Sequence, residues 1–296
     1  MTRPLAPQEM YPAGVAEVAT RMVPLPTGVR LRVAESGPPY GEPVVLLHGW
    51  GASLYMYRHA HQLLAEKGFR VLTPDLRGFG LSDRPAATET GSYTLDAYLS
   101  DATALLDELS LPRVALVGQS MGGGIALQLA LRVPIRVTQL ALINPTGLVP
   151  VSYVGALRLV PRDVANALGR AMVPRLLVEV ILRRVAYGDP SLAGDQDVDE
   201  YWAPTQLPGC VGAARGALDD FDWQPVAAAE LGRLAVPSVV ILGKQDRLIR
   251  DARAAAERLR GSLVHVIEGG HCVHEEHPRE VYDIVAGFFR GSQETA

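Results

Sequence analysis

Short apolar runs that alternate with amphipathic segments constrain the fold of this chain more than any other feature of its sequence. Val44–Leu47 and Val114–Val117 are apolar at every position, as strands buried on both faces are. Leu95–Leu109 carries its apolar residues at helical spacing. Such alternation predicts a parallel sheet with helices on both faces. We expect further strands at Val15–Val23, Val29–Glu35, Arg70–Thr73, Gln139–Ile143, Ser238–Leu242 and Leu263–Ile267, and further helices at Leu54–Glu66, Met121–Leu131, Asp251–Arg260 and Pro278–Phe289.

The segment from Pro145 to about Trp223 interrupts this alternation. It lacks buried-strand runs, and its apolar residues recur at helical spacing, as in Leu176–Val185 and Val211–Phe221. We therefore predict a helical insertion at residues 145–223, within a core formed by residues 1–144 and 224–296. The pattern does not distinguish a lid over a site from a packed structural extension.

Composition excludes several classes of protein. Lys and Arg number 28 against 32 Asp and Glu, which gives a net charge of −4 and argues against a nucleic-acid binder. The two cysteines, Cys210 and Cys272, are too few for a disulfide scaffold.

The N-terminus has no apolar core of a signal peptide. Because Pro145 and Pro150 break the longest uncharged stretch, Val137–Leu157, we expect a cytoplasmic protein without a membrane span.

A Gly-x-Ser-x-Gly motif carries the strongest chemical signal in the chain. Gly118-Gln119-Ser120-Met121-Gly122 follows a buried strand and opens an apolar helix. In that setting the serine sits on a strained strand-to-helix turn, and the small glycines let the backbone approach closely. The hydroxyl is then aimed at the carboxyl edge of the sheet, where ligands of open α/β folds bind. This pattern predicts that Ser120 is a nucleophile.

A nucleophilic serine needs a base, and the base needs an acid that orients it. Asp246 follows the strand Ser238–Leu242, and His271 follows the strand Leu263–Ile267, so both are expected at the same edge as Ser120. The order Ser, Asp, His along the chain is the one this architecture uses. The rivals are weaker, because Asp251 suits a helix N-cap, Asn144 cannot ionise, and His274 and His277 lie farther from the strand.

Acyl transfer also needs N–H groups that stabilise the developing oxyanion. The backbone N–H of Met121, directly after the serine, is one candidate donor. The second is the N–H of Trp50 in His48-Gly49-Trp50-Gly51, which follows the strand Val44–Leu47; His48 itself is interpreted as structural. The candidate residues for a substrate pocket are Gly49, Gln119, Tyr153 and Trp202.

Together these motifs resemble the α/β-hydrolase superfamily, in the branch of serine hydrolases with a helical cap. The resemblance runs from about Val15 to Phe289 and includes the loop Asp75-Leu76-Arg77-Gly78-Phe79-Gly80-Leu81-Ser82-Asp83 and the motif Gly243-Lys244-Gln245-Asp246-Arg247. It implies a mostly parallel eight-stranded sheet flanked by helices, with an inserted all-helical cap and no cofactor. In this superfamily the Asp75 loop is mainly structural, so neither Asp75 nor Arg77 is assigned a catalytic role.

The same resemblance makes several relatives unsuitable as a guide to activity. Epoxide hydrolases and haloalkane dehalogenases of this fold attack with an aspartate, whereas Ser120 stands at that position here. The group His271, Cys272, His274 and His277 fits no standard zinc spacing, so no metal site is expected. Cys272 is interpreted as a packing residue.

These observations favour a serine hydrolase that cleaves small to medium carboxylic esters through an acyl-enzyme. A C–C bond hydrolase acting on ring-fission products, a cofactor-free perhydrolase or acyltransferase, and a slow-turnover ligand receptor stay open as alternatives. The expected partner is a small-molecule ester, with no nucleic acid, and a homodimer is left open.

Arginines of the insertion that faced the site would favour an anionic substrate, although charges on such helices usually face solvent. The six arginines concerned are Arg158, Arg162, Arg170, Arg175, Arg183 and Arg184.

Overall fold

The computed structural model describes residues 3–86, 91–159, 173–259 and 261–291. Eight strands form one sheet in the order β1-β2-β4-β3-β5-β6-β7-β8. The pairs β1/β2 and β2/β4 are antiparallel, and every other pair is parallel. The predicted mostly parallel eight-stranded sheet is therefore confirmed. The strands are β1 (Ala19–Pro24), β2 (Arg30–Ser36), β3 (Pro43–Leu47), β4 (Arg70–Pro74), β5 (Val114–Gln119), β6 (Val137–Ile143), β7 (Ser238–Gly243) and β8 (Leu263–Ile267).

Helices cover both faces of this sheet, which explains why its central strands are apolar at every position. Side chains alternate along a strand, so Val44 and Leu46 pack on one face while Val45 and Leu47 pack on the other. One face is covered by α1 (Arg58–Ala65), α11 (Val273–Glu276) and α12 (Pro278–Gly291), and the opposite face by α2 (Leu95–Glu108) and α3 (Ser120–Arg132).

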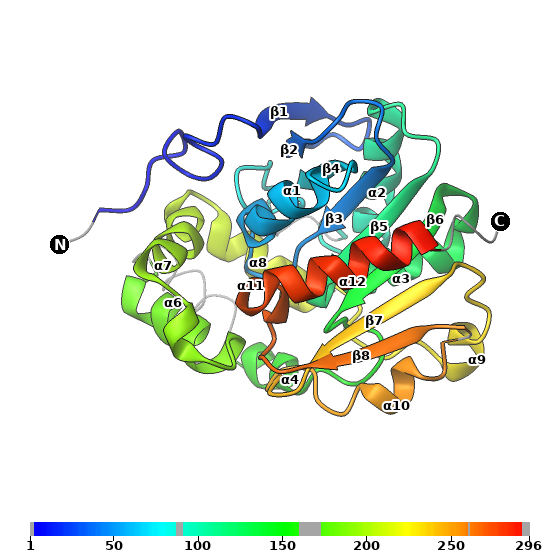
Figure 1. The fold of residues 1–296 in the computed structure, drawn as a ribbon. Coiled ribbons are helices and arrows are strands. Elements are labelled where there is room, and N and C mark those ends of the chain that lie inside the picture. Colours follow the sequence, from blue (N-terminus) through cyan, green and yellow to red (C-terminus); the bar gives the residue numbers. More distant parts are fainter. Residues whose placement is uncertain (1–2, 87–90, 160–172, 260, 292–296) are drawn as a thin grey trace.

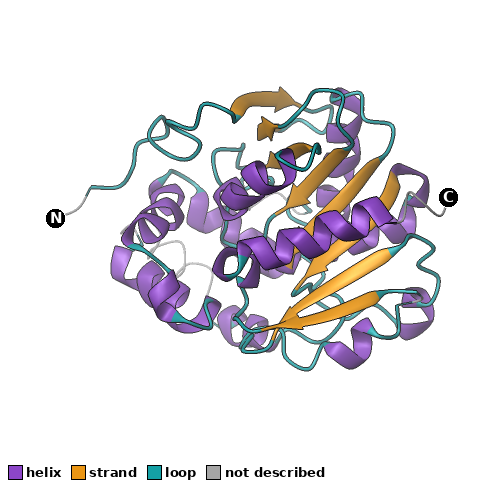
Figure 2. Ribbon diagram, in the orientation of Figure 1, coloured by secondary structure: helices purple, strands orange, loops and turns teal. Residues whose placement is uncertain are grey.

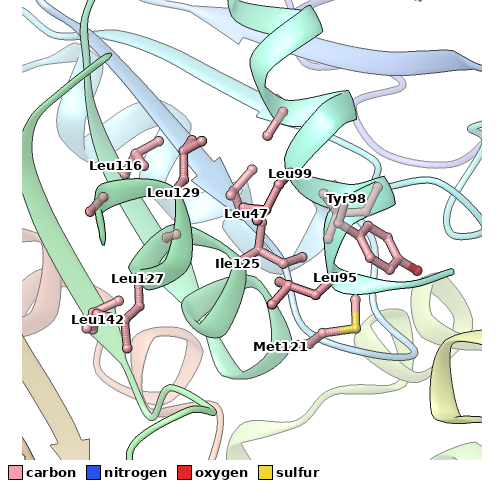
Figure 3. Packing of buried hydrophobic residues seen from close by; sticks show 14 of the residues in the cluster. Leu47, Leu95, Tyr98, Leu99, Leu116, Met121, Ile125, Leu127, Leu129 and Leu142 are labelled. Atoms are coloured by element: carbon pink, nitrogen blue, oxygen red, sulfur yellow. The ribbon is translucent and has the colours of Figure 1, made fainter. Parts of the chain in front are cut away.

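Figure 3 shows the second of these layers at close range. Leu47 and Leu116 of the sheet meet Ile125 and Leu129 of α3 and Leu99 of α2. All of them are buried. This packing fixes α3 against the centre of the sheet, and α3 carries Ser120 at its first position.

Three predicted elements differ from the observed ones. Residues 15–18 are not strand. Ala19 pairs with Glu35, and β2 ends one residue later at Ser36, so residues 15–17 have no residue of β2 opposite them. The helix predicted from Leu54 begins with a turn of 3-10 helix, Leu54–Tyr57, before α1. The helix predicted from Asp251 is shorter, α10 (Arg253–Ala256), and Asp251 is an exposed residue with a φ of 58° and not its N-cap.

The described residues between β6 and α9 (Ala228–Leu231) form helices and no strand. Figures 1 and 2 show these helices gathered beside the ends of the central strands. The apolar residues of α6 are unusual, since Leu176 is 68% exposed and Ile181 is 49% exposed. The elements are α4 (Ser152–Arg158), α6 (Arg175–Ile181), a π-helix (Leu182–Ala186), 3-10 turns at Pro190–Leu192 and Ala203–Gln206, α7 (Asp195–Trp202) and α8 (Cys210–Asp220).

Within the described ranges, no helix has the length and apolar character needed to cross a membrane. The uncharged stretch Val137–Leu157 consists of β6, a loop and most of α4.

Candidate active site

Ser120 occupies a strained turn between β5 and α3. Its φ is 51°, in the left-handed region that residues other than glycine seldom adopt. The turn is tight because its neighbours are glycines: a Cβ at Gly118 would lie 2.5 Å from the carbonyl oxygen of Gly122, and one at Gly122 would lie 2.0 Å from that of Leu47. Neither contact is tolerable, so this elbow requires glycine at both positions. As a result, Ser120 is only 3% exposed.

The end of the neighbouring strand β6 supports this elbow. The carbonyl oxygen of Ser120 accepts hydrogen bonds from the backbone N–H of Thr146 at 3.0 Å and from its hydroxyl at 3.2 Å. Thr146 is buried, and a Cβ at Gly124 would lie 2.3 Å from its Oγ1. The loop after β6 is thus packed directly against the first turn of α3.

His271 and Asp246 form a buried pair at the ends of β8 and β7. The distance between His271 Nδ1 and Asp246 Oδ2 is 2.8 Å. Asp246 Oδ1 is held separately, by the backbone N–H of Leu248 at 2.7 Å and of Ile249 at 3.0 Å. Because a carboxylate can only accept, His271 Nδ1 is the donor of this hydrogen bond, and Nε2 takes no part in it. The structure therefore brings together the predicted base and acid.

Two buried amides hold the backbone of the His271 loop. Gln119 donates from Nε2 to the carbonyl oxygen of His271 at 3.0 Å. Asn144 donates from Nδ2 to the carbonyl oxygens of Gly270 at 3.1 Å and His271 at 3.0 Å, and its Oδ1 accepts from the N–H of Gly243 at 2.9 Å. Asn144 thereby ties the end of β7 to the loop that follows β8.

The sequence did not indicate this role for either amide. Gln119 is 1% exposed, with its side chain directed at the His271 loop, whereas we expected it to line a pocket. From the sequence, Asn144 is only a rival position for the acid. One feature of the sequence could have indicated this role. Each amide stands at the end of an otherwise apolar central strand, and a buried amide must find hydrogen-bond partners.

Glu276 links the same loop to the inserted segment. Its Oε1 accepts from the N–H of Gly270 at 2.6 Å, and its Oε2 accepts from the N–H of Gly188 at 2.8 Å and of Asp189 at 3.0 Å. The N–H of Cys272 also donates to the carbonyl oxygen of Ala186 at 3.1 Å. The insertion is thus joined by hydrogen bonds to the loop that carries His271.

The loop after β3 is fixed by His48. This fully buried side chain donates from Nδ1 to the carbonyl oxygen of Gly49 at 2.8 Å and accepts the N–H of Leu76 on Nε2 at 2.9 Å. Burial lowers the pKa of His48, which keeps the ring neutral, as these two bonds require.

The direction of the Gly49 carbonyl determines that of the Trp50 N–H. The two belong to one planar trans peptide unit and point in opposite directions. A Cβ at Gly49 would lie 3.1 Å from the Ser120 Cβ, so this peptide unit lies beside the predicted nucleophile. The N–H of Met121 lies in the first turn of α3, where no helical acceptor is available to it.

The residues expected to line a pocket lie in different places. Tyr153 of α4 is half-buried, and its ring packs edge-on against Trp223 with the ring centroids 6.5 Å apart. Gly49 lies against Gln119 and Ser120. Trp202, at the end of α7, is 8% exposed and donates from its indole nitrogen to the carbonyl oxygen of Val173 at 2.8 Å, within the insertion. The indole nitrogen of Trp50 donates to Ala214 of α8 at 2.8 Å.

The loop that begins at Asp75 is held by hydrogen bonds within itself and to neighbouring elements. Asp75 is fully buried and accepts the N–H of Leu54 at 2.7 Å and of Leu81 at 2.8 Å. Arg77 pairs with Asp101 through two hydrogen bonds of 2.6 and 2.7 Å. These contacts account for both side chains structurally.

The described arginines of the insertion do not turn toward Ser120. Arg158 donates to the carbonyl oxygens of Leu218 and Asp219. Arg175 and Arg183 pair with acidic side chains of α6 and α7. Arg184 is exposed. Arg162 and Arg170 lie outside the described residues.

The remaining polar groups near His271 are buried. Burial raises the pKa of the Cys272 thiol well above its usual value, which keeps the thiol protonated and packed with apolar neighbours. Burial lowers the pKa of His274, whose ring lies against Tyr57. Among the described residues, no group of three or more His, Cys, Asp or Glu side chains is arranged to hold a metal ion.

Known proteins share this architecture. An uncharacterised protein of Mycobacterium tuberculosis is 32% identical over 274 residues, which cover 87% of this chain and 76% of that protein. Epoxide hydrolase A of the same organism is 29% identical over 310 residues, covering 89% of this chain and 95% of that enzyme. The solved structure of a meta-cleavage product hydrolase from Pseudomonas fluorescens has a TM-score of 0.77 at 24% identity and covers 93% of this chain and 99% of that one. The family described as having the alpha/beta hydrolase fold matches residues 42–278. This chain therefore belongs to the α/β-hydrolase superfamily.

Proposed function

We propose that the protein is a serine hydrolase that cleaves carboxylic esters of small to medium size. The observation that carries this proposal is the buried His271–Asp246 pair, which follows β8 and β7 at the sheet edge where the strained Ser120 follows β5. A strained serine with an oriented imidazole and carboxylate is the arrangement that activates a hydroxyl for acyl transfer.

In the proposed acylation step, His271 Nε2 takes the proton of the Ser120 hydroxyl while Oγ attacks the ester carbonyl carbon. Asp246 keeps the proton on Nδ1 and stabilises the imidazolium that forms. The N–H groups of Trp50 and Met121 stabilise the oxyanion. Collapse of the tetrahedral intermediate expels the alcohol, which receives the proton from His271. Water activated by the same imidazole then releases the acid and regenerates Ser120, and no cofactor enters either step.

Residues 145–223 act in this proposal as a cap over the site. Two contacts support that role. The Trp50 indole donates to the carbonyl oxygen of Ala214 in α8, and Glu276 joins the insertion to the His271 loop. A structural extension packed elsewhere on the core would make neither of these contacts.

C–C bond hydrolysis is the second candidate function, because the chain shares its fold with a meta-cleavage product hydrolase. Ring-fission dienoates carry a carboxylate, for which an inward-facing arginine is the preferred partner. The described arginines of the cap pair with acidic side chains, donate to backbone carbonyl oxygens of the cap, or face solvent, and this favours a neutral ester. Epoxide opening is disfavoured, because it would need an aspartate where Ser120 stands.

The test is to purify the protein and its Ser120→Ala variant and to assay both with p-nitrophenyl esters of increasing acyl length and with a ring-fission dienoate. We expect ester turnover by the native protein, and loss of about 10⁴-fold or more in kcat together with loss of fluorophosphonate labelling in the variant. Labelling of Ser120→Ala would overturn the assignment of the nucleophile. Preference for the dienoate, for peroxide or an alcohol over water, or binding without turnover would each favour one of the alternatives.

A further inference from the structure

The loop that carries His271 depends on outside contacts for its shape. Two glycines, Gly269 and Gly270, precede the histidine, and glycine gives a chain more conformational freedom than any other residue. The φ of Gly269 is 135°, a value that residues with a side chain rarely adopt. Contacts from elsewhere in the molecule must therefore fix this loop, and with it the position of the His271 imidazole.

Four side chains hold the peptide groups of this loop. They bind the N–H groups of Gly269 and Gly270 and the carbonyl oxygens of Gly270 and His271. The four are Gln119, Asn144, Gln245 and Glu276. Within the described residues, Glu276 is the one of these four that also bonds to the inserted segment.

The Glu276 carboxylate receives N–H groups from both sides of the boundary between core and cap. Its Oε1 accepts from the N–H of Gly270 at 2.6 Å. Its Oε2 accepts from those of Gly188 and Asp189, in the cap, at 2.8 and 3.0 Å. Hydrogen bonds to a charged acceptor are roughly twice as strong as neutral ones. Glu276 is also only 7% exposed, so water scarcely replaces these donors.

The cap loop of residues 186–189 and the His271 loop touch along their backbones. A Cβ at Gly270 would lie 2.4 Å from the backbone nitrogen of Gly188 and 2.6 Å from the carbonyl oxygen of Ala186. A Cβ at Gly188 would lie 2.7 Å from the backbone nitrogen of Gly270. Because no side chain separates the two loops, a shift of the cap loop is passed directly to the backbone beside the histidine.

A shift of that backbone changes the hydrogen bond between His271 and Asp246. Oδ1 of Asp246 is bonded to the N–H groups of Leu248 and Ile249, so the carboxylate does not follow the histidine. His271 Nδ1 lies 2.8 Å from Oδ2, and a displacement of the imidazole lengthens or bends this hydrogen bond. The bond therefore reports where the loop places the ring.

We propose that Glu276 is a positioning residue for His271 and that it acts only while the cap loop lies against the core. This inference rests on the proposed ester hydrolysis at Ser120, in which His271 Nε2 takes the serine proton. The cap loop donates two N–H groups to Oε2, which holds the carboxylate where Oε1 accepts from Gly270. Without that loop, Glu276 loses two of these three donors, and His271 loses its fixed place for proton transfer.

The first test compares the native protein with Glu276→Gln. The amide has the same size, but its NH₂ group faces N–H donors on one side, so one of the two loops is released. We expect kcat for a p-nitrophenyl ester to fall about 10- to 100-fold, as a small misplacement of a catalytic group predicts. His271 acts in both acylation and deacylation, so the two steps slow together and KM should stay within about threefold.

Proton NMR supplies a second readout that needs no substrate. A ring proton donated to a carboxylate in a buried hydrogen bond resonates far downfield, and the side chains of His271 and Asp246 are 7% and 2% exposed. We expect this resonance to move upfield, or to be lost through exchange with water, in Glu276→Gln. A residue that served stability alone would leave the resonance in place. Urea unfolding checks that each variant is folded.

A second pair of variants tests the cap side of the contact. Asp189→Pro removes one N–H donor and turns a φ of −106° toward the value of about −65° that proline requires, so the cap loop moves away from Glu276. Asp189→Ala keeps the N–H and loses only the side-chain hydrogen bonds to Ser191. We expect the proline to lower kcat about tenfold and to shift the resonance. The alanine should stay within about twofold in kcat.

Tyr55→Phe is the control for a cap that is loosened elsewhere. The Tyr55 hydroxyl donates to Asp197 of α7 at 2.7 Å, so this variant loses a hydrogen bond between core and cap that does not involve the His271 loop. We expect its kcat to stay within about twofold and its resonance to be unchanged. An equal fall of kcat in Tyr55→Phe and Glu276→Gln, or a native kcat in Asp189→Pro, would overturn the inference.

The two readouts separate this inference from the proposed function. If the native protein hydrolyses esters but Glu276→Gln changes neither kcat nor the resonance, the serine hydrolase stands and the role of Glu276 fails. If the native protein turns over no ester while the resonance responds to Glu276→Gln and Asp189→Pro, the proposed function fails and the coupling stands. If Glu276→Gln does not fold, Asp189→Pro and its alanine control decide the question.

Discussion

The two oxygens of the Asp246 carboxylate have separate tasks. Oδ1 accepts two backbone N–H groups, which leaves Oδ2 directed at His271 Nδ1 at 2.8 Å. The side chain of Asp246 is 2% exposed, so solvent scarcely competes for these hydrogen bonds. The orientation of the imidazole is thus set by a carboxylate that is itself fixed by the backbone.

Asp246→Asn should lower kcat for esters by roughly 10³–10⁴-fold. The amide keeps the shape of the side chain, but its NH₂ group can face Nδ1 and stabilise the wrong tautomer of His271. Ester turnover and the rate of fluorophosphonate labelling both measure this loss.

Asp251→Asn is the matched control, since Asp251 is the rival acid in the same stretch of chain. It is exposed, and its φ of 58° suits asparagine equally well. We expect its activity to stay within twofold of the native value. A large loss in Asp251→Asn with little loss in Asp246→Asn would reverse the assignment of the acid.

At the scale of elements, α1, α7 and α11 meet around one arginine whose side chain is 13% exposed. Arg58 of α1 pairs with Asp197 of α7 at 2.8 Å and with Glu275 of α11. Its guanidinium also lies 4.4 Å from the centre of the Tyr55 ring. The side chain of Glu275 has no exposed surface, so its charge depends on this pairing. Arg58 thus joins the core to the cap.

Arg58→Ala should destabilise the protein by about 3–5 kcal/mol, because it leaves the charge of Glu275 buried without its partner. Urea unfolding at neutral pH measures the change. Arg253→Ala is the control, because Arg253 and Glu257 form a surface pair whose side chains are 70% and 53% exposed. The control should cost less than ~1 kcal/mol. If the two substitutions lowered the free energy of unfolding equally, the larger contribution assigned to the Arg58–Glu275 pair would be wrong.

At the scale of the whole molecule, the N-terminal arm links core and cap. The N–H of Tyr11 donates to Glu200 of α7 at 2.8 Å, and its carbonyl oxygen accepts from Arg32 of β2 at 2.5 Å. Figure 1 shows this arm running from β1 past α7. Glu200 is 5% exposed, and burial raises its pKa to about 7. The N–H of Tyr11 and the charges of Arg32 and Arg58 oppose this rise, while Asp197 adds to it.

This shift makes stability depend on pH in a defined direction. Below the ordinary pKa of 4.5, Glu200 is protonated in the folded and unfolded states alike. Between about 4.5 and 7 the unfolded chain releases the proton while the folded protein retains it, so the contribution of Glu200 to stability falls as pH rises and is lost above about 7.

Glu200→Gln should remove this dependence while preserving an acceptor for the N–H of Tyr11. Relative to the native protein, its free energy of unfolding should gain on the order of 2 kcal/mol between pH 5 and pH 8. Urea unfolding at the two pH values measures the gain. Glu108→Gln, at an exposed position of α2, should show none. A gain of the same size in both variants would contradict the role assigned to Glu200.

Much of the fold could be predicted because its signals are local. The apolar runs at β3 and β5 are continuous because both faces of the sheet are covered. The predicted segment from Val15 failed at its start because a strand needs a partner, and β2 ends too early to provide one. Asp251 failed as an N-cap because the tertiary fold places it in a turn with positive φ, before a shorter helix.

The sequence by itself determined the sheet, the elbow at Ser120 and the strand ends that carry Asp246 and His271, since residues adjacent in the chain specify strands, helices and tight turns. Only the tertiary structure decided that Gln119 and Asn144 hold the His271 loop, and that Arg175 and Arg183 pair with acidic side chains of the inserted helices. Gln119 and His271 are 152 residues apart in sequence. A buried polar side chain must find a hydrogen-bond partner, but which one it finds depends on chain segments brought together by folding.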